Sequence, residues 1–166
     1  MKKHLPSGAD VIVWKVTGSL IALVLLFLAL AGAIRPLPLA VLIVFYCIAG
    51  VLGLIVIAGF LARPVQYEVR DDSITIRRSS PFSSITIPKS SIKAIRHIEL
   101  GSFKPAVAAL PWVFGYVGRF RNGELGSFSM FATNIKGEVV FIDAGEKYVI
   151  SPGNSRRFVH DVSGKR

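Results

Sequence analysis

Residues 16–34 read VTGSLIALVLLFLALAGAI and residues 37–61 read LPLAVLIVFYCIAGVLGLIVIAGFL, and neither stretch contains a charged side chain. An α-helix rises about 1.5 Å per residue, so each stretch is long enough to cross a hydrocarbon core about 30 Å thick. Only Arg35 and Pro36 lie between them. The sequence therefore predicts a two-helix transmembrane hairpin over residues 1–62 and one soluble domain over residues 63–166.

The basic side chains around the two stretches predict their orientation. Lys2, Lys3 and Lys15 precede the first stretch, and Arg63, Arg70, Arg77 and Arg78 follow the second. Because cytoplasmic flanks carry an excess of Lys and Arg, we expect both termini and the soluble domain on the cytoplasmic side. A cleaved signal peptide is the alternative, since Ala29, Ala31 and Ala33 resemble a cleavage site, but the first stretch exceeds the usual apolar length of such peptides.

The formal net charge is +10, and residues 63–166 contain 16 Lys and Arg against 9 Asp and Glu. A basic domain beside a membrane is attracted to anionic lipid headgroups. No recognition-helix, RNA-binding or zinc motif accompanies the charge, so nucleic acid is not an expected partner. Cys47 is the only cysteine, which excludes an intrachain disulfide and a Cys-rich metal site.

The apolar residues after Pro64 change from a helical to an alternating period. Alternation on either side of Asp71 and Asp72, over residues 65–70 and 73–77, predicts a β-hairpin. Further strands are expected over residues 82–87, 92–100, 128–132, 139–143 and 147–150. The glycine- and proline-containing stretch 101–125 reads as a long loop with one or two short strands.

A short C-terminal helix is expected to follow the last strand. Ser151 is a favourable N-cap and Pro152 a favourable first helical residue. The apolar face of this helix would consist of Phe158, Val159 and Val162, with Arg156, Arg157 and His160 directed to solvent. The soluble part is thus predicted to be about seven antiparallel strands closed by a helix.

Several motifs of the soluble part resemble those of a known family. They are FGYVGRFR at 114–121, Leu125-Gly126, FATN at 131–134, and YVISP at 148–152 followed by Phe158. This set is similar to the bacterial pleckstrin-homology-like (PH-like) domains, which often carry two N-terminal membrane spans. The resemblance implies a membrane α-hairpin plus a mainly β or α+β domain, a seven-stranded antiparallel barrel or sandwich closed by a C-terminal helix. It also implies a multi-pass protein of the bacterial cytoplasmic (inner) membrane.

The resemblance implies no catalytic residues and no cofactor. Eukaryotic PH domains bind inositol phosphates with a basic cluster at the loop between their first two strands, whereas Asp71 and Asp72 occupy that loop here and would repel an anion. His4, His97 and His160 are isolated and belong to no recognisable catalytic or metal-ligating motif. We therefore expect no enzymatic activity, no cofactor and no metal site.

A stretch rich in aromatic and basic residues is the best candidate for a binding surface. It contains Trp112, Phe114 and Tyr116, followed by Arg119 and Arg121. Aromatic rings enter the headgroup layer and arginines pair with phosphates, but the same residue types also anchor protein partners. Core packing of the aromatic rings is a third interpretation, because a small β domain needs large side chains inside.

The predicted function is non-enzymatic. The hairpin would hold the PH-like domain at the cytoplasmic membrane face, where the domain binds an unidentified protein partner or further copies of itself. Small residues four apart, such as Ala49 and Gly53, would allow helices to pack closely in a homo-oligomer. The alternative is a sensor of anionic lipid headgroups that uses residues 112–121.

Overall fold

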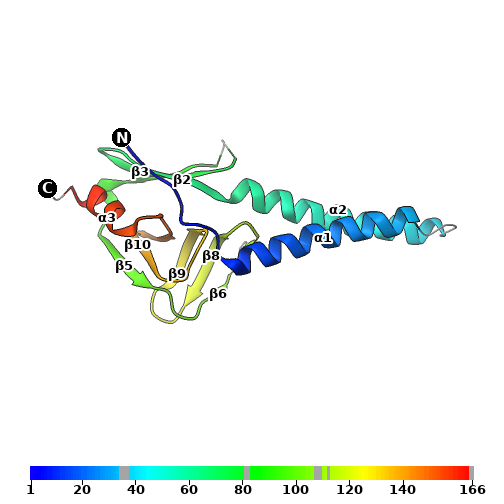
Figure 1. Cartoon of the computed structure of the whole chain (residues 1–166). Helices are drawn as coiled ribbons and strands as arrows, with labels where there is room; N and C mark the ends of the chain where they lie inside the picture. Colours follow the sequence, from blue (N-terminus) through cyan, green and yellow to red (C-terminus); the bar gives the residue numbers. More distant parts are fainter. Residues whose placement is uncertain (34–37, 81–82, 107–109, 112, 165–166) are drawn as a thin grey trace.

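The computed structural model describes residues 1–33, 38–80, 83–106, 110–111 and 113–164. Two long helices, α1 (Val11–Ala33) and α2 (Leu39–Ala62), lie side by side and project from one end of a domain of two β-sheets and a short helix (Figure 1). Both helices are long and apolar enough to cross a membrane, and most of their side chains are exposed. The predicted span ends at residues 34 and 37 lie outside the described residues.

Helix α1 begins at Val11, five residues before the predicted span, because Asp10 caps it. The backbone N–H of Ile12 donates to Asp10 Oδ1 at 3.4 Å, and the N–H of Trp14 donates to the Asp10 carbonyl at 3.2 Å. Helix α2 ends at Ala62, its C-cap is Arg63, and Pro64 then starts a strand. A proline lacks the N–H that a continuing helix needs, which explains this boundary.

The first sheet has four antiparallel strands in the order β1-β2-β3-β4. They are β1 (Lys2–His4), β2 (Pro64–Val69), β3 (Ser73–Arg78) and β4 (Ile85–Pro88). The predicted hairpin around Asp71 and Asp72 is confirmed, with the N–H of Arg70 donating to the Ser73 carbonyl at 2.8 Å across the turn. Strand β1 was not predicted, and it pairs Lys2 with Val69 and His4 with Tyr67.

The second sheet has seven strands, with β5-β10-β11-β9-β8-β6 in order and β7 also paired with β8. The strands are β5 (Ala94–Glu99), β6 (Lys104–Pro105), β7 (Leu110–Pro111), β8 (Tyr116–Asn122), β9 (Gly126–Ala132), β10 (Glu138–Ala144) and β11 (Glu146–Ile150), and a 3-10 turn, η1 (Lys89–Ser91), precedes β5. Strand β8 corrects the prediction of a long loop with one or two short strands over 101–125, because it is a seven-residue strand inside the sheet, in addition to the short strands β6 and β7.

The PH-like architecture of two helices, β-sheets and a C-terminal helix is confirmed, with two corrections to its predicted details. The described residues form a four-stranded and a seven-stranded sheet instead of seven strands in all. One pair, β9 with β11, is parallel. Strand β10 lies between them in the chain and is antiparallel to β11, so β11 has the same direction as β9. The two sheets do not close into a barrel, and they pack as a sandwich.

The alternation of side chains along the second sheet produces two cores. The first lies between the sheets and contains Tyr67, Ile74, Ile76, Val117, Phe131, Val140, Ile142, Ile150 and Phe158. The second lies on the opposite face of the seven-stranded sheet and contains Tyr116, Phe120, Phe128, Met130, Val139, Phe141 and Val149. Val13 of α1 belongs to this second core, so the base of the helical hairpin is packed directly onto the domain.

The C-terminal helix α3 (Ser155–Ser163) starts later than predicted. Asn154 is its N-cap, and its side chain accepts a hydrogen bond from the N–H of Arg157 at 2.9 Å. Ser151 is instead buried, and its hydroxyl oxygen accepts from the N–H of Thr133 at 2.9 Å, so Ser151 is not available as a cap. The predicted faces are confirmed, because Phe158 is buried while Arg156, Arg157 and His160 are exposed.

Candidate functional site

The first ten residues form an arm that lies across both sheets. The N–H of Gly153 donates to the Leu5 carbonyl and the N–H of Ser7 to the Ser151 carbonyl, both at 2.8 Å. The N–H of Asp10 donates to the Thr133 carbonyl at 3.1 Å, at the end of β9. Backbone bonds therefore fix the arm before it enters α1, and they fix the position of α1 on the domain.

Residues 113–115 of the domain contact both helices. The N–H of Phe114 donates to Thr17 Oγ1 of α1 at 3.1 Å, and the Phe114 ring meets the Phe60 ring of α2 edge-on, with centroids 5.6 Å apart. Gly59 of α2 lies against Val113, where an added Cβ would come within 2.5 Å of a Val113 methyl carbon. Phe114 has a positive φ of 57°, which is unusual for a residue with a side chain.

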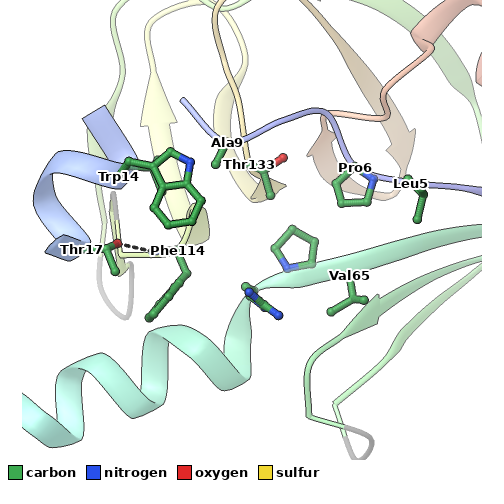
Figure 2. A pocket seen from close by; sticks show the side chains of 11 residues that line it. Leu5, Pro6, Ala9, Trp14, Thr17, Val65, Phe114 and Thr133 are labelled. Carbon is green, nitrogen blue, oxygen red and sulfur yellow. Dashed lines mark hydrogen bonds between the residues drawn. The ribbon is translucent and has the colours of Figure 1, made fainter. Parts of the chain in front are cut away.

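A cavity of about 350 Å³ lies where the arm, the two helices and β2 meet. We call it the junction cavity, and it is lined by Leu5, Pro6, Ala9, Val13, Trp14, Thr17, Arg63, Pro64, Val65, Phe114 and Thr133. Figure 2 shows Trp14 and Phe114 on one side and Leu5, Pro6 and Val65 on the other. Most of these side chains are apolar, so the cavity suits an apolar group.

Three apolar side chains around the junction cavity are exposed. The exposed fractions are 73% for Leu5, 66% for Trp14 and 41% for Val65. Arg63 is the one charged residue of the described lining, and its guanidinium lies 4.4 Å from the Phe60 ring centroid. Its Nε donates to Ser79 Oγ at 2.9 Å, which holds the head group at the end of α2.

Of the five residues predicted as a binding surface, the four that the structure describes are not brought together. Trp112 lies outside the described residues. Phe114 lines the junction cavity, whereas Tyr116 is fully buried in the second core, and its hydroxyl donates to Asp10 Oδ2 at 3.5 Å. Arg119 and Arg121 are exposed on β8. With a rise of about 3.3 Å per residue, they lie roughly 10 and 16 Å along the strand from Tyr116.

The geometry therefore separates the candidates by their positions. Tyr116 fills the core, which is the third interpretation considered for the aromatic residues, and a side chain without exposed surface makes no contact with a partner. Arg119 lines a different groove with Ser127, Ser129, Glu146 and Lys147. Leu5, Ala9 and Thr133 were not predicted at the junction cavity, since these residues come from segments far apart in the chain and no local pattern links them.

Several buried titratable residues serve structural contacts. His4 is buried and its Nε2 lies 3.1 Å from Asp161 Oδ2, and Lys2 Nζ donates to Asp161 Oδ1 at 2.6 Å. Glu68 is buried and lies between Arg70 and Arg77, at 3.3 and 3.2 Å. Burial raises the pKa of the Tyr67 phenol, whose hydroxyl donates to the Phe131 carbonyl at 2.7 Å. Among the described residues, no group of three His, Cys, Asp or Glu side chains is placed to hold a metal ion.

Comparison with known protein families gives one match. The family model described as "Bacterial PH domain" matches residues 65–166, which is well over half of the chain. A comparison with curated proteins finds no match. The matched range begins inside β2 and includes both sheets except β1, together with α3.

Proposed function

Because the chain belongs to the bacterial PH domain family, we propose that it is a membrane-anchored, non-catalytic binding module. Membership of this family indicates binding of proteins or lipids. The proposal adds that helices α1 and α2 cross the bacterial cytoplasmic membrane as a hairpin, and that residues 63–166 form a domain at its inner face. The arm of residues 1–10 packs on this domain and would remain on the same side.

The exposed apolar surface of the two helices supports the membrane anchor. Leu25 and Leu54 are examples, with exposed fractions of 60% and 67%. A soluble protein rarely exposes large contiguous apolar areas, whereas lipid tails cover such areas without cost. Lys15 lies in the first turns of α1 at its domain end, Lys2 and Lys3 lie on the domain itself in β1, and Arg63 lies at the domain end of α2, which favours the cytoplasmic side for the domain.

The partner favoured by the geometry is a protein that inserts an apolar side chain into the junction cavity. The observation that carries this proposal is the exposed apolar rim of Leu5, Trp14 and Val65 around an apolar cavity. Interfaces derive most of their binding energy from aromatic and arginine anchors in such recesses, and Trp14 and Arg63 supply both types. A second copy of the chain is the other protein that could supply the inserted side chain.

The alternative of an anionic-lipid sensor that uses residues 112–121 receives less support from the structure. Its two arginines are on β8 and far along the strand from the helix junction, and Tyr116 is buried. A headgroup contact through these residues would require the far end of β8 to reach the bilayer surface.

Site-specific photo-crosslinking in native membranes tests the protein partner. A photo-reactive phenylalanine analogue is placed at Trp14 or Val65, with Thr86 on β4 as the exposed control position. We expect positions 14 and 65 to crosslink one discrete protein or a second copy of the chain, and position 86 to give no such product. Trp14→Ala should then reduce copurification of the identified protein about tenfold, as expected for the loss of an interface anchor. Crosslinks to lipid alone would contradict the proposal.

A further inference from the structure

A second, polar recess also lies at the start of β2. It has a volume of about 260 Å³ and is lined by Val65, Gln66, Arg77, Arg78, Ser79, Ser80 and Ser84. We call it the arginine–serine pocket. Its described lining contains two guanidinium groups, three hydroxyls and one amide, and no carboxylate. This set consists mainly of hydrogen-bond donors with a positive charge, which is the chemistry that recognises phosphate.

Hydrogen bonds place this pocket at the level where α2 ends. The N–H of Ser80 donates to the Leu61 carbonyl in the last turn of α2, and the N–H of Ser79 donates to the Arg63 carbonyl, both at 3.0 Å. The side chain of Ser79 also accepts the bond from Arg63 Nε. If α2 spans the membrane, these residues lie in the layer of lipid headgroups that borders the hydrocarbon core.

The charge of the pocket is not fully neutralised. Glu68 is shared by Arg70 and Arg77, so one carboxylate faces two guanidinium groups. Arg78 has no carboxylate partner within the described ranges; its Nε donates to the Ser83 carbonyl and its guanidinium lies 5.5 Å from the Phe131 ring centroid. Partial burial lowers the pKa of Arg78, because desolvation disfavours its charged form. A bound anion would compensate this charge.

The pocket is also distant from the acidic turn that argued against anion binding. Asp71 and Asp72 lie at the turn of the β2–β3 hairpin, and the other end of the hairpin lies beside α2 (Figure 1). The pocket residues Gln66, Arg77 and Arg78 belong to that other end. Strand β3 has six residues, which at about 3.3 Å each separate the two ends by roughly 17 to 20 Å. This is about twice the screening length of physiological salt, so repulsion by the aspartates is weak there.

We propose that the arginine–serine pocket binds the phosphate of an anionic phospholipid in the leaflet that faces the domain. The proposal rests on the proposed membrane anchor but uses a different site and ligand from the protein partner. Arg77 and Arg78 supply the charge and the planar donor pairs that match phosphate oxygens. The hydroxyls of Ser79, Ser80 and Ser84 and the amide of Gln66 complete the donor set.

The test uses the full chain in lipid nanodiscs made of equal amounts of phosphatidylcholine and phosphatidylglycerol. Native mass spectrometry of the ejected protein measures the ratio of the two lipids that stay bound. We expect phosphatidylglycerol to be enriched about tenfold, which corresponds to one hydrogen-bonded ionic contact. Ser84→Glu and Arg77→Gln should each return the ratio to about that of the bulk lipid.

Matched control variants change a serine and an arginine outside the pocket, Ser127 and Arg121. Ser127 and Arg121 are also exposed and face each other in register on β9 and β8. Ser127→Glu and Arg121→Gln add or remove the same charges outside the pocket and should leave the enrichment within about twofold. Equal loss in both pairs would overturn the pocket and assign the effect to net charge.

A second experiment distinguishes binding of lipid phosphate from binding of soluble phosphate. Glycerol 1-phosphate is added to nanodiscs of phosphatidylcholine alone, and its phosphorus NMR line width is recorded. Broadening that Ser84→Glu removes, without enrichment of phosphatidylglycerol, would overturn the lipid as the source of the phosphate. The absence of both signals would overturn the site itself. Failure of the chain to incorporate into nanodiscs would overturn the proposed membrane anchor. Incorporation without enrichment of phosphatidylglycerol would overturn the lipid site alone, so the two outcomes are distinguishable.

Discussion

The junction cavity and the arginine–serine pocket both lie at the start of β2, and Val65 lines both. One recess is apolar with Arg63 as its charged residue, and the other is a set of arginines and serines. The strand contributes Pro64 to the first and Gln66 to the second. Their chemical difference therefore comes from the other segments that line them: the arm and α1 in the junction cavity, and the end of β3 with the residues that follow it in the arginine–serine pocket.

The largest effect is expected from a change beside the apolar junction cavity, at the contact between α2 and residues 113–115. Gly59→Ala would bring a Cβ within 2.5 Å of Val113 and force α2 away from residues 113–115. We expect the free energy of unfolding in detergent to fall by about 1–3 kcal/mol, as for other overpacked sites. Gly53→Ala is the control in the same helix, because no atom lies within 4 Å of its added Cβ. Equal unfolding midpoints for the two variants would show that the close approach of α2 to Val113 is not needed.

A smaller effect is expected from loosening the arm, which lines the junction cavity but not the arginine–serine pocket. Asp161→Asn removes the carboxylate that holds Lys2 and His4. Hydrogen exchange at the backbone amides of residues 2–4 should become faster, while exchange at residues 77–80 should stay the same. Faster exchange at both segments would mean that the two recesses are not independent.

The same contact predicts a pH dependence of the arm. The hydrogen bond from Lys2 is the largest cause that lowers the pKa of Asp161, and burial opposes it. A lowered carboxyl pKa stabilises the folded form above the ordinary value of 3.8, and this stabilisation is lost as the pH falls through the lowered value. Protection of residues 2–4 at neutral pH should therefore decrease in acid in the wild type and be weak at both pH values in Asp161→Asn.

The smallest effect is expected from the residues that belong to neither recess. Arg119→Ala combined with Arg121→Ala removes two exposed charges from β8. Crosslinking at position 14 and enrichment of phosphatidylglycerol should each change by less than about twofold, as is usual for exposed sites without special contacts. A larger loss would restore residues 112–121 as a lipid-binding surface and would require the far end of β8 to approach the membrane.

The elements that could be predicted from the sequence have strong local patterns. The two apolar stretches, the alternation around Asp71 and Asp72, and the apolar face of α3 depend on neighbouring residues alone. The length of β8 was underestimated because the glycines and prolines of residues 101–125, among them Gly115 and Gly118, indicated a long loop with only one or two short strands. Both have a positive φ, and Gly115 is required because a Cβ would come within 2.8 Å of the Ala132 carbonyl oxygen.

The candidate site was predicted less well because its parts are distant in the chain. The three residues of β1 have no alternating apolar pattern, so only their partner β2 defines them as a strand. The same arm explains the error at Ser151: the adjacent Pro152 forms a bridge with Pro6, so the chain at 151–153 is bound to the arm and α3 starts after it. Phe114 was predicted as a contact residue for its type, but the cavity that it lines exists only after both helices are in place.

The pairing of β1 with β2 has a consequence for biogenesis. Under the proposed topology, in which α1 and α2 cross the membrane, Lys2 is synthesised before the two helices and its partner Val69 only after them. The arm can therefore pair with β2 only after the hairpin has been inserted. Both strands would then have to lie on the same side of the bilayer, which requires an even number of crossings. A chain inserted with a single crossing would leave an incomplete sheet with an unpaired edge, a feature that quality-control proteases can recognise. In this way the first sheet makes completion of the domain conditional on correct topology.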